Sequence, residues 1–141
     1  MPRQGTNANP GTYTEQTGDT DMHTSTISPA TALHATAANL NNSFEIIALQ
    51  FRADVDFAAQ ETAMANLNAV VQTAEGFKSR DYYYSEENGH WIEFIVWEDD
   101  ASAKAASKAM MRNDEAIAVF CLVDEKTMLF SHYQHKGGIA A

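Results

Sequence analysis

The sequence predicts a small α+β domain, in which helices cover one face of an antiparallel sheet. Two runs, residues 44–52 and 90–98, carry large apolar side chains on both faces, which is typical of central strands. A stretch with helical spacing of apolar residues follows each run. With 141 residues, the chain has room for one ordinary hydrophobic core.

The composition is acidic, and this argues against two classes of partner. The formal net charge is −10 at pH 7, and the sequence pI is near 4.7. Binding to nucleic-acid phosphates or anionic membranes needs clustered Lys and Arg. No apolar run approaches the roughly 20 residues of a membrane helix, and the first residues lack the apolar block of a secretory signal. We therefore expect a cytoplasmic protein with no nucleic-acid or membrane partner.

Residues 1–42 are predicted to form a disordered tail. They are rich in Thr, Ala and Asn, contain all three prolines of the chain, and have few large apolar side chains. Such a segment cannot offset the entropy lost on ordering, although residues 28–40 can form a weak helix beginning at Pro29. His23 and His34 lie here, and we expect them to be solvated, because no Cys or His partner stands at metal-ligand spacing.

The folded domain is predicted to span residues 43–135, with a short tail at 136–141. Its first strand covers residues 44–52. Asp54 or Asp56 can cap the helix that follows. That helix is expected to run over residues 57–75 and to end at Gly76, where a glycine can adopt the left-handed conformation.

The second and third strands are predicted to form a hairpin. Residues 77–85 combine tyrosines with three charged side chains, which suits an edge strand. Residues 86–89 supply the turn, in which Asn88 and Gly89 can adopt positive φ. The chain then returns antiparallel through residues 90–98.

A second helix is expected over residues 101–112, capped by Asp99 or Asp100. A short helix over residues 115–122 and a last strand over residues 127–135 complete the domain. Cys121, the single cysteine, is expected to be a small buried hydrophobe rather than a nucleophile. The inner stripe of the second helix is small, which can leave space for a ligand: Ala103, Ala106, Ala109 and Met110.

The order β-α-β-β-α-β is that of ferredoxin-like domains. Right-handed crossovers put both main helices on one face of the sheet, with the first and third strands at its centre and the second on an edge. The other face would be an exposed apolar patch in a monomer. We therefore expect a homodimer, in which a second copy covers that face.

Four segments are distinctive: GF followed by the tyrosine-rich strand, HWIEFIVWEDDASAKAA, the Met-rich end of the second helix, and FSHY in the last strand. Together they resemble the antibiotic biosynthesis monooxygenase group of dimeric α+β-barrel proteins. The resemblance covers about residues 44–134. The resemblance implies this fold. The family includes cofactor-free oxygenases of phenolic or quinone-like compounds. Haem-degrading members combine a first-strand asparagine, a third-strand tryptophan and a second-helix histidine, of which only the tryptophan, Trp97, is present here.

Two residues are candidate catalytic groups, Glu93 and His132. Glu93 interrupts an apolar face of the third strand. If buried, it is either a general base with a raised pKa or the partner of a cation such as Arg52, Arg80 or Lys78 across a dimer seam. His132 lies among hydrophobes on the last strand and can exchange a proton with a phenol near neutral pH. A satisfied structural histidine is the alternative.

Four residues are predicted to bind substrate: Trp97, Phe94, Met110 and Met111. The resemblance implies that Trp97 lines a pocket between sheet and helices, and core packing is the alternative for the tryptophan and for both methionines. Together with these residues, the resemblance implies a monooxygenase of a small aromatic compound that uses no cofactor and no metal. A catalytically silent binding or interaction protein of the same fold is the other reading.

Overall fold

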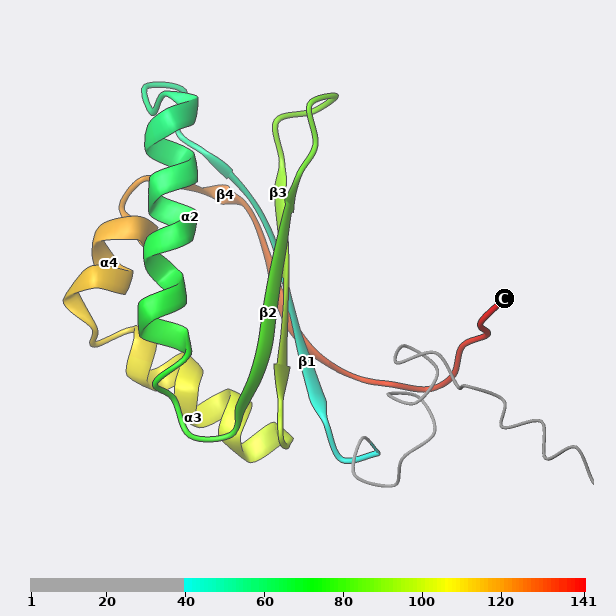
Figure 1. Ribbon diagram of the computed structural model, residues 1–141. Helices are drawn as coiled ribbons and strands as arrows, with labels where there is room; N and C mark the ends of the chain where they lie inside the picture. Colours follow the sequence, from blue (N-terminus) through cyan, green and yellow to red (C-terminus); the bar gives the residue numbers. More distant parts are fainter. Residues whose placement is uncertain (1–39) are drawn as a thin grey trace, which may run out of the picture.

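The computed structural model describes residues 40–141, which form a four-stranded antiparallel sheet with three helices on one side (Figure 1). The strands lie in the order β2-β3-β1-β4, so the fold is ferredoxin-like, as predicted. The predicted tail, with His23 and His34, lies almost wholly outside the described residues. In chain order the elements are β1 Ser43–Phe51, α2 Phe57–Val71, β2 Phe77–Tyr84, β3 Trp91–Trp97, α3 Asp100–Met110, α4 Asp114–Phe120 and β4 Val123–Gln134.

The core lies between the helices and the two central strands. Along β1 and β3, buried side chains alternate with half-buried ones, as strand geometry requires. The buried set faces the helices, and α2 contributes Met64, Leu67 and Val71 to the same layer. The small residues Ala103 and Ala106 let α3 lie close to the sheet. None of the described helices is both long and apolar enough to cross a membrane.

A polar side chain caps the N-terminus of each of the helices α2, α3 and α4. Asp56 accepts a hydrogen bond from the Ala59 amide at 2.8 Å, and Asp99 accepts one from the Ser102 amide at 2.7 Å. Asn113 caps α4 in the same way. Of the two aspartates available at each predicted cap, the structure therefore uses Asp56 and Asp99.

Two predicted boundaries are wrong. The first helix ends at Val71, and residues 72–76 form a turn that places Gly76 at φ +78° before β2 begins. The amide of Glu98 donates to the Gly76 carbonyl at 2.7 Å, so this turn is tied to the end of β3. The last strand begins at Val123, earlier than predicted, because it pairs with Phe51 of β1.

Cys121 is exposed, which corrects the expectation of a buried thiol. It is the C-terminal cap of α4, just beyond the turn whose Ala116 and Val119 pack into the core. The buried residues of α4 are spaced along one face of the helix, and Cys121 does not lie on that face. Burial was predicted because Cys121 lies in an apolar run, residues 117–123. This run spans the end of α4 and the start of β4.

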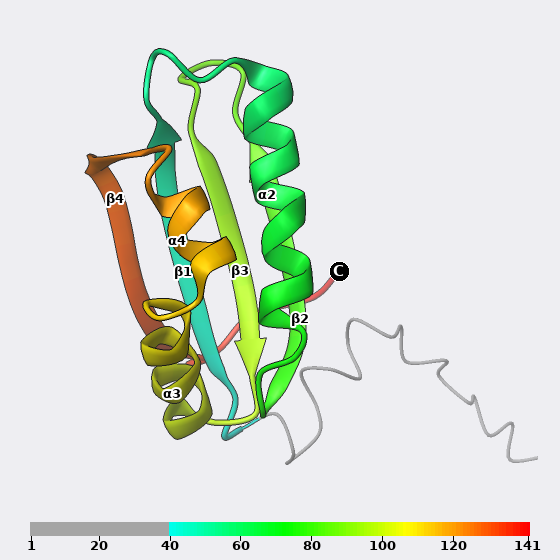
Figure 2. The same cartoon turned by 90° about the vertical axis from the view of Figure 1, so that its left-hand side faces the viewer.

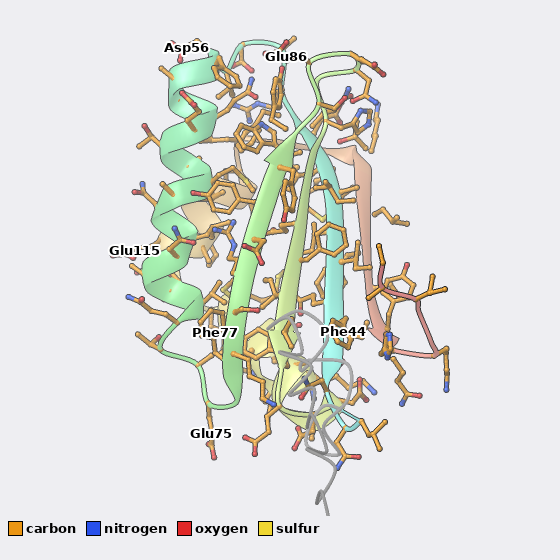
Figure 3. The ribbon with its side chains drawn as sticks, turned by 45° about the vertical axis from the view of Figure 1, so that its right-hand side comes forward. Phe44, Asp56, Glu75, Phe77, Glu86 and Glu115 are labelled. Carbon is orange, nitrogen blue, oxygen red and sulfur yellow. The ribbon has the colours of Figure 1, made fainter. Side chains whose placement is uncertain are left out.

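The face of the sheet opposite the helices is apolar and bears no helix of the described chain (Figure 1). We call it the bare face. Phe44 marks it in Figure 3, on the side of the sheet away from α2. Its edge-strand side chains Tyr83 and Leu129 are each 56% exposed. The central strands contribute half-buried side chains: Phe44, Ile46, Ile92, Phe94 and Val96.

Candidate functional site

A cavity of about 420 Å³ lies on the helix side of the sheet, bounded by β1, β4, α3 and α4. In Figure 2, α3 and α4 lie over β1, and part of the edge strand β4 is left uncovered by helices. We call it the β4 cavity. Its lining residues are Glu45, Ile47, Ser107, Met110, Met111, Phe120, Glu125, Met128 and Phe130.

A carboxylate and an imidazole meet at the wall of the β4 cavity. Glu45 on β1 pairs directly with His132 on β4, and His132 Nε2 lies 2.9 Å from Glu45 Oε2. The Ser107 hydroxyl of α3 donates to the same carboxylate oxygen at 3.2 Å. The Glu45 side chain is only 5% exposed and that of His132 16%. The pair is therefore held by three different elements and is largely removed from water.

Burial raises the pKa of Glu45, because removal from water disfavours the charged carboxylate. His132 and Ser107 oppose this by stabilising the charge. The indole N–H of Trp97, which is buried and makes no hydrogen bond within residues 40–141, also favours the charged form. Glu45 is thus a stronger base than an exposed glutamate, and it stands beside a second proton carrier.

The rest of the cavity wall is made of sulfur and aromatic side chains. Met110, Met111 and Met128 come from two elements, and thioethers adapt to the face or edge of an aromatic ring. Phe120 and Phe130 add flat apolar surface. Within residues 40–141, no Lys or Arg lines the cavity. Its lining suits an aromatic ring with a polar group directed at Glu45.

Glu93 lies in a separate buried cluster, on the β2 side of the sheet. Its Oε2 accepts a hydrogen bond from Arg80 Nε at 2.7 Å, and Arg80 Nη2 lies equally close, although it is poorly aligned for a hydrogen bond. Arg80 Nη1 also donates to the Met64 carbonyl and to Asn68 Oδ1 on α2. Burial raises the pKa of Glu93, and the Arg80 charge opposes that shift. The cation partner of Glu93 is therefore Arg80, one of the three cations considered above, and it belongs to the same chain.

The structure divides the predicted site residues among four places, of which the Arg80–Glu93 cluster is one. Met110 and Met111 line the β4 cavity, and His132 contacts its Glu45. Trp97 is fully buried beside Glu45 and lines a separate hollow of about 210 Å³, which shares Met110 with the cavity. Phe94 points to the bare face, opposite the cavity. Glu93 and Phe94 therefore do not meet His132.

Sequence reasoning missed Glu45, Ser107 and Glu125. A signal for Glu45 was present, because it alternates with Ile47 and Leu49 on the helix-facing side of β1. The same argument singled out Glu93 on β3. Its pairing with His132, 87 residues later, depends on the β1–β4 register, and an alternation pattern carries no information about register.

A wider open groove of about 930 Å³ lies between α2 and α4, bordered by Asp56 and Glu115 (Figure 3). Its wall is mostly alanine, and the Asp56 carboxylate is already engaged as a helix cap. It contains no acid–base pair among the described residues. In residues 40–141 no three His, Cys, Asp or Glu side chains converge as a metal site.

No family model matches the sequence, and no curated protein matches it. Solved structures do resemble it. The cofactor-independent oxygenase SnoaB from Streptomyces nogalater superposes with a TM-score of 0.58 at 13% identity, over 72% of this chain and 99% of that one. The monooxygenase ActVA-Orf6 of Streptomyces coelicolor, in complex with nanaomycin D, gives 0.55 at 15% identity over 72% and 93%. The chain has the fold of these oxygenases.

A dimeric ferredoxin-like protein of unknown function from Jannaschia sp. CCS1 also resembles the chain. Its TM-score is 0.52 at 10% identity, over 67% of this chain and 100% of that one. The expected resemblance to monooxygenase-type α+β-barrel proteins is thereby confirmed for the fold. At such identities a likeness speaks for the fold alone, and activity must be argued from the site.

Proposed function

We propose that the protein is a cofactor-independent monooxygenase of a small phenolic or quinone-like aromatic compound, bound in the β4 cavity. The observation that carries the proposal is a buried carboxylate–imidazole pair, Glu45 and His132, at the wall of an apolar cavity. In this proposal Glu45 and His132 accept and return the proton. In this proposal the role of Glu93 is structural, because it is paired away from the cavity with Arg80, which α2 in turn holds.

The proposed reaction begins when the phenol O–H gives its proton to the Glu45–His132 pair. The phenolate passes one electron to O₂, and the resulting radical and superoxide combine at the para carbon, which forms a C–O bond. The pair returns the proton to give a hydroperoxide. Loss of the para hydrogen with cleavage of the O–O bond then releases water. One phenol and one O₂ thus give one quinone and one water, and the substrate supplies all the electrons.

Two features of the site support this chemistry. The raised pKa of Glu45 brings its basicity closer to that of a phenol than an exposed carboxylate would be. The Met- and Phe-lined wall limits water around the radical pair and can pack on an aromatic ring. The proposal is also supported by the likeness in fold to SnoaB, a cofactor-independent oxygenase.

We also propose that the working molecule is a homodimer in the cytoplasm, built on the bare face. The support for the dimer is the apolar character of that face and the dimeric state of the similar Jannaschia protein. The cytoplasmic location stays a prediction from composition.

Oxygen uptake tests the proposed activity. The purified, metal-free protein is mixed with a panel of hydroquinones and polycyclic phenols, and uptake is followed with an oxygen electrode while the quinone is followed by its absorbance. Glu45→Gln and His132→Gln are each expected to lower kcat by about 10²–10⁴, the usual contribution of a positioned acid or base.

Two matched variants control for general effects of the substitutions. Glu115→Gln removes a carboxylate at the α2–α4 groove, and His90→Gln removes a histidine that contacts Gln50. Both are expected to keep the wild-type rate. Binding of these compounds without uptake, in a folded wild-type protein, would instead identify a catalytically silent binding protein.

A further inference from the structure

We propose that the β4 cavity selects a cationic aromatic compound, a phenol that carries a basic amine, and rejects anionic analogues. The phenol would lie at Glu45 and the ammonium group at Glu125. The inference rests on the proposed function, because it takes the same cavity as the substrate site, and it adds the charge class of the substrate.

Glu125 reaches the cavity because β4 is irregular beside it. His132 and Val123 both face the helices, since they pair with the buried Glu45 and Phe51 of β1. They are an odd number of positions apart, so strict alternation would put them on opposite faces. The β1–β4 register shifts between Ala48 and Gln50. As in a β-bulge, this shift changes which residues of β4 face the helices. Glu125, two residues after Val123, therefore falls on the helix side.

The cavity carries negative charge without a matching cation. Glu45 has His132 as its partner, but Glu125 forms no ion pair or side-chain hydrogen bond within residues 40–141. Lys126 follows it in the chain and does not line the cavity. An anionic ligand would meet two carboxylates there, whereas an ammonium group would meet an unpaired one.

The two carboxylates lie at opposite ends of the cavity. Glu45 pairs with His132, and Asp124, next to Glu125, pairs with Gln50 further along β1. At about 3.4 Å per residue, Gln50 is roughly 17 Å from Glu45 along β1, and Glu125 lies one position nearer, at roughly 14 Å. Met128 and Phe130 line the space between them. An elongated aromatic ligand with a donor at one end and a cation at the other matches this arrangement.

Three naphthols test the inference, identical except for one substituent on the ring remote from the hydroxyl: aminomethyl, methyl or carboxylate. Dissociation constants are measured by calorimetry with the full-length protein near pH 7. The aminomethyl compound is expected to bind about three- to fivefold more tightly than the methyl compound, the size of an exposed ion pair. The carboxylate is expected to bind more weakly than the methyl compound, and salt should reduce both differences.

Glu125→Gln assigns the preference to one residue. This exposed substitution is expected to bring the aminomethyl-to-methyl ratio to about one, while Glu115→Gln, which removes the same charge outside the cavity, should leave the ratio as in the wild type. Equal or tighter binding of the carboxylate, an unchanged ratio in Glu125→Gln, or no binding of any compound at millimolar concentration would each overturn the inference.

The experiment separates this inference from the proposed function. A charge preference that depends on Glu125 supports the inference even if none of the three compounds is oxidised. Uptake of oxygen with the methyl compound, without any charge preference, would support the oxygenase and overturn the inference.

Discussion

Arg80 shows how one side chain can join three elements. From β2 it neutralises Glu93 on β3 and donates to Met64 and Asn68 on α2. Its guanidinium also lies 4.5 Å from the centre of the Tyr82 ring. The Arg80 side chain is 2% exposed, so this ion pair is in the core rather than on the surface. Each partner therefore depends on the other to remain buried.

Glu93→Gln is expected to destabilise the protein by about 3–5 kcal/mol, because it leaves the Arg80 charge buried without its counter-ion. The free energy of unfolding is measured by urea denaturation followed by far-ultraviolet dichroism. The double variant Arg80→Met, Glu93→Leu is expected to recover most of the loss, since it removes both charges and keeps apolar volume.

The exposed ion pair between Arg52 and Asp54 supplies the control. Both side chains are at least half exposed, and Asp54→Asn is expected to change stability by no more than about 1 kcal/mol. A similar small effect of Glu93→Gln would mean that Arg80 is adequately solvated without the carboxylate.

Glu45 and Glu93 differ in what surrounds them rather than in how deeply they lie. Both are nearly inaccessible, and burial raises the pKa of each. Glu93 faces a permanent cation, Arg80. Glu45 faces a titratable imidazole and an open wall. Only the second environment can pass a proton to and from a bound molecule.

At the scale of elements, Gly76 controls how closely α3 approaches the start of β2. A β-carbon at this position would lie 2.5 Å from Cβ and Oγ of Ser102, in the first turns of α3. The residue also has φ +78°, which disfavours any other side chain.

Gly76→Ala is expected to cost more stability than Gly89→Ala, although both glycines have positive φ. At Gly89 the added carbon would meet nothing closer than 3.9 Å, so only the backbone strain of roughly 1–2 kcal/mol applies. At Gly76 a steric term is added. The midpoints and slopes of urea unfolding for both variants measure the difference.

Ser102→Gly identifies the steric part, because it removes the side-chain atoms that the added β-carbon would meet. We expect this second change to rescue part of the Gly76→Ala loss in a double-mutant cycle. Equal losses in Gly76→Ala and Gly89→Ala would show that α3 moves aside without cost.

The elements themselves could be predicted because their signals are local. Two strands with apolar residues on both faces belong in the centre of a sheet, and Asp56 and Asp99 stand where a helix must begin. The end of α2 was harder to predict. The helical spacing of apolar residues continues to Ala74, which packs partly in the core from a turn, so the pattern alone extends the helix too far.

The candidate site was predictable only in part, because its contacts join strands that are remote in sequence. His132 and the two methionines could be identified from their own strand and helix. Glu45 needed the β1–β4 register to find its partner, and Glu125 needed the irregularity in β4 to change face. Neither the β1–β4 register nor the irregularity in β4 can be predicted from the local periodicity of apolar residues.

At the scale of the whole molecule, the bare face is an apolar surface that no helix of residues 40–141 covers. We expect the full-length protein to sediment as a dimer at micromolar concentration. Phe94→Asp is expected to shift it to a monomer, because Phe94 pairs with Ile46 at the centre of this face and an unpaired charge there would be buried by the second sheet.

Ile117→Asp is the matched control, since Ile117 is an exposed apolar residue on α4, on the other side of the sheet. It is expected to leave the dimer intact. A wild-type monomer, or a Phe94→Asp variant that still sediments as a dimer, would show that the bare face is not the contact surface.

The β4 cavity and the bare face lie on opposite sides of one sheet. If two copies join through their bare faces, their cavities open outward, away from each other, and two layers of strands separate them. Neither subunit then lends a residue to the other's cavity. Ligand binding in one cavity then has no direct contact through which to change the affinity of the other. Such a dimer would work as two independent catalysts rather than as a cooperative pair.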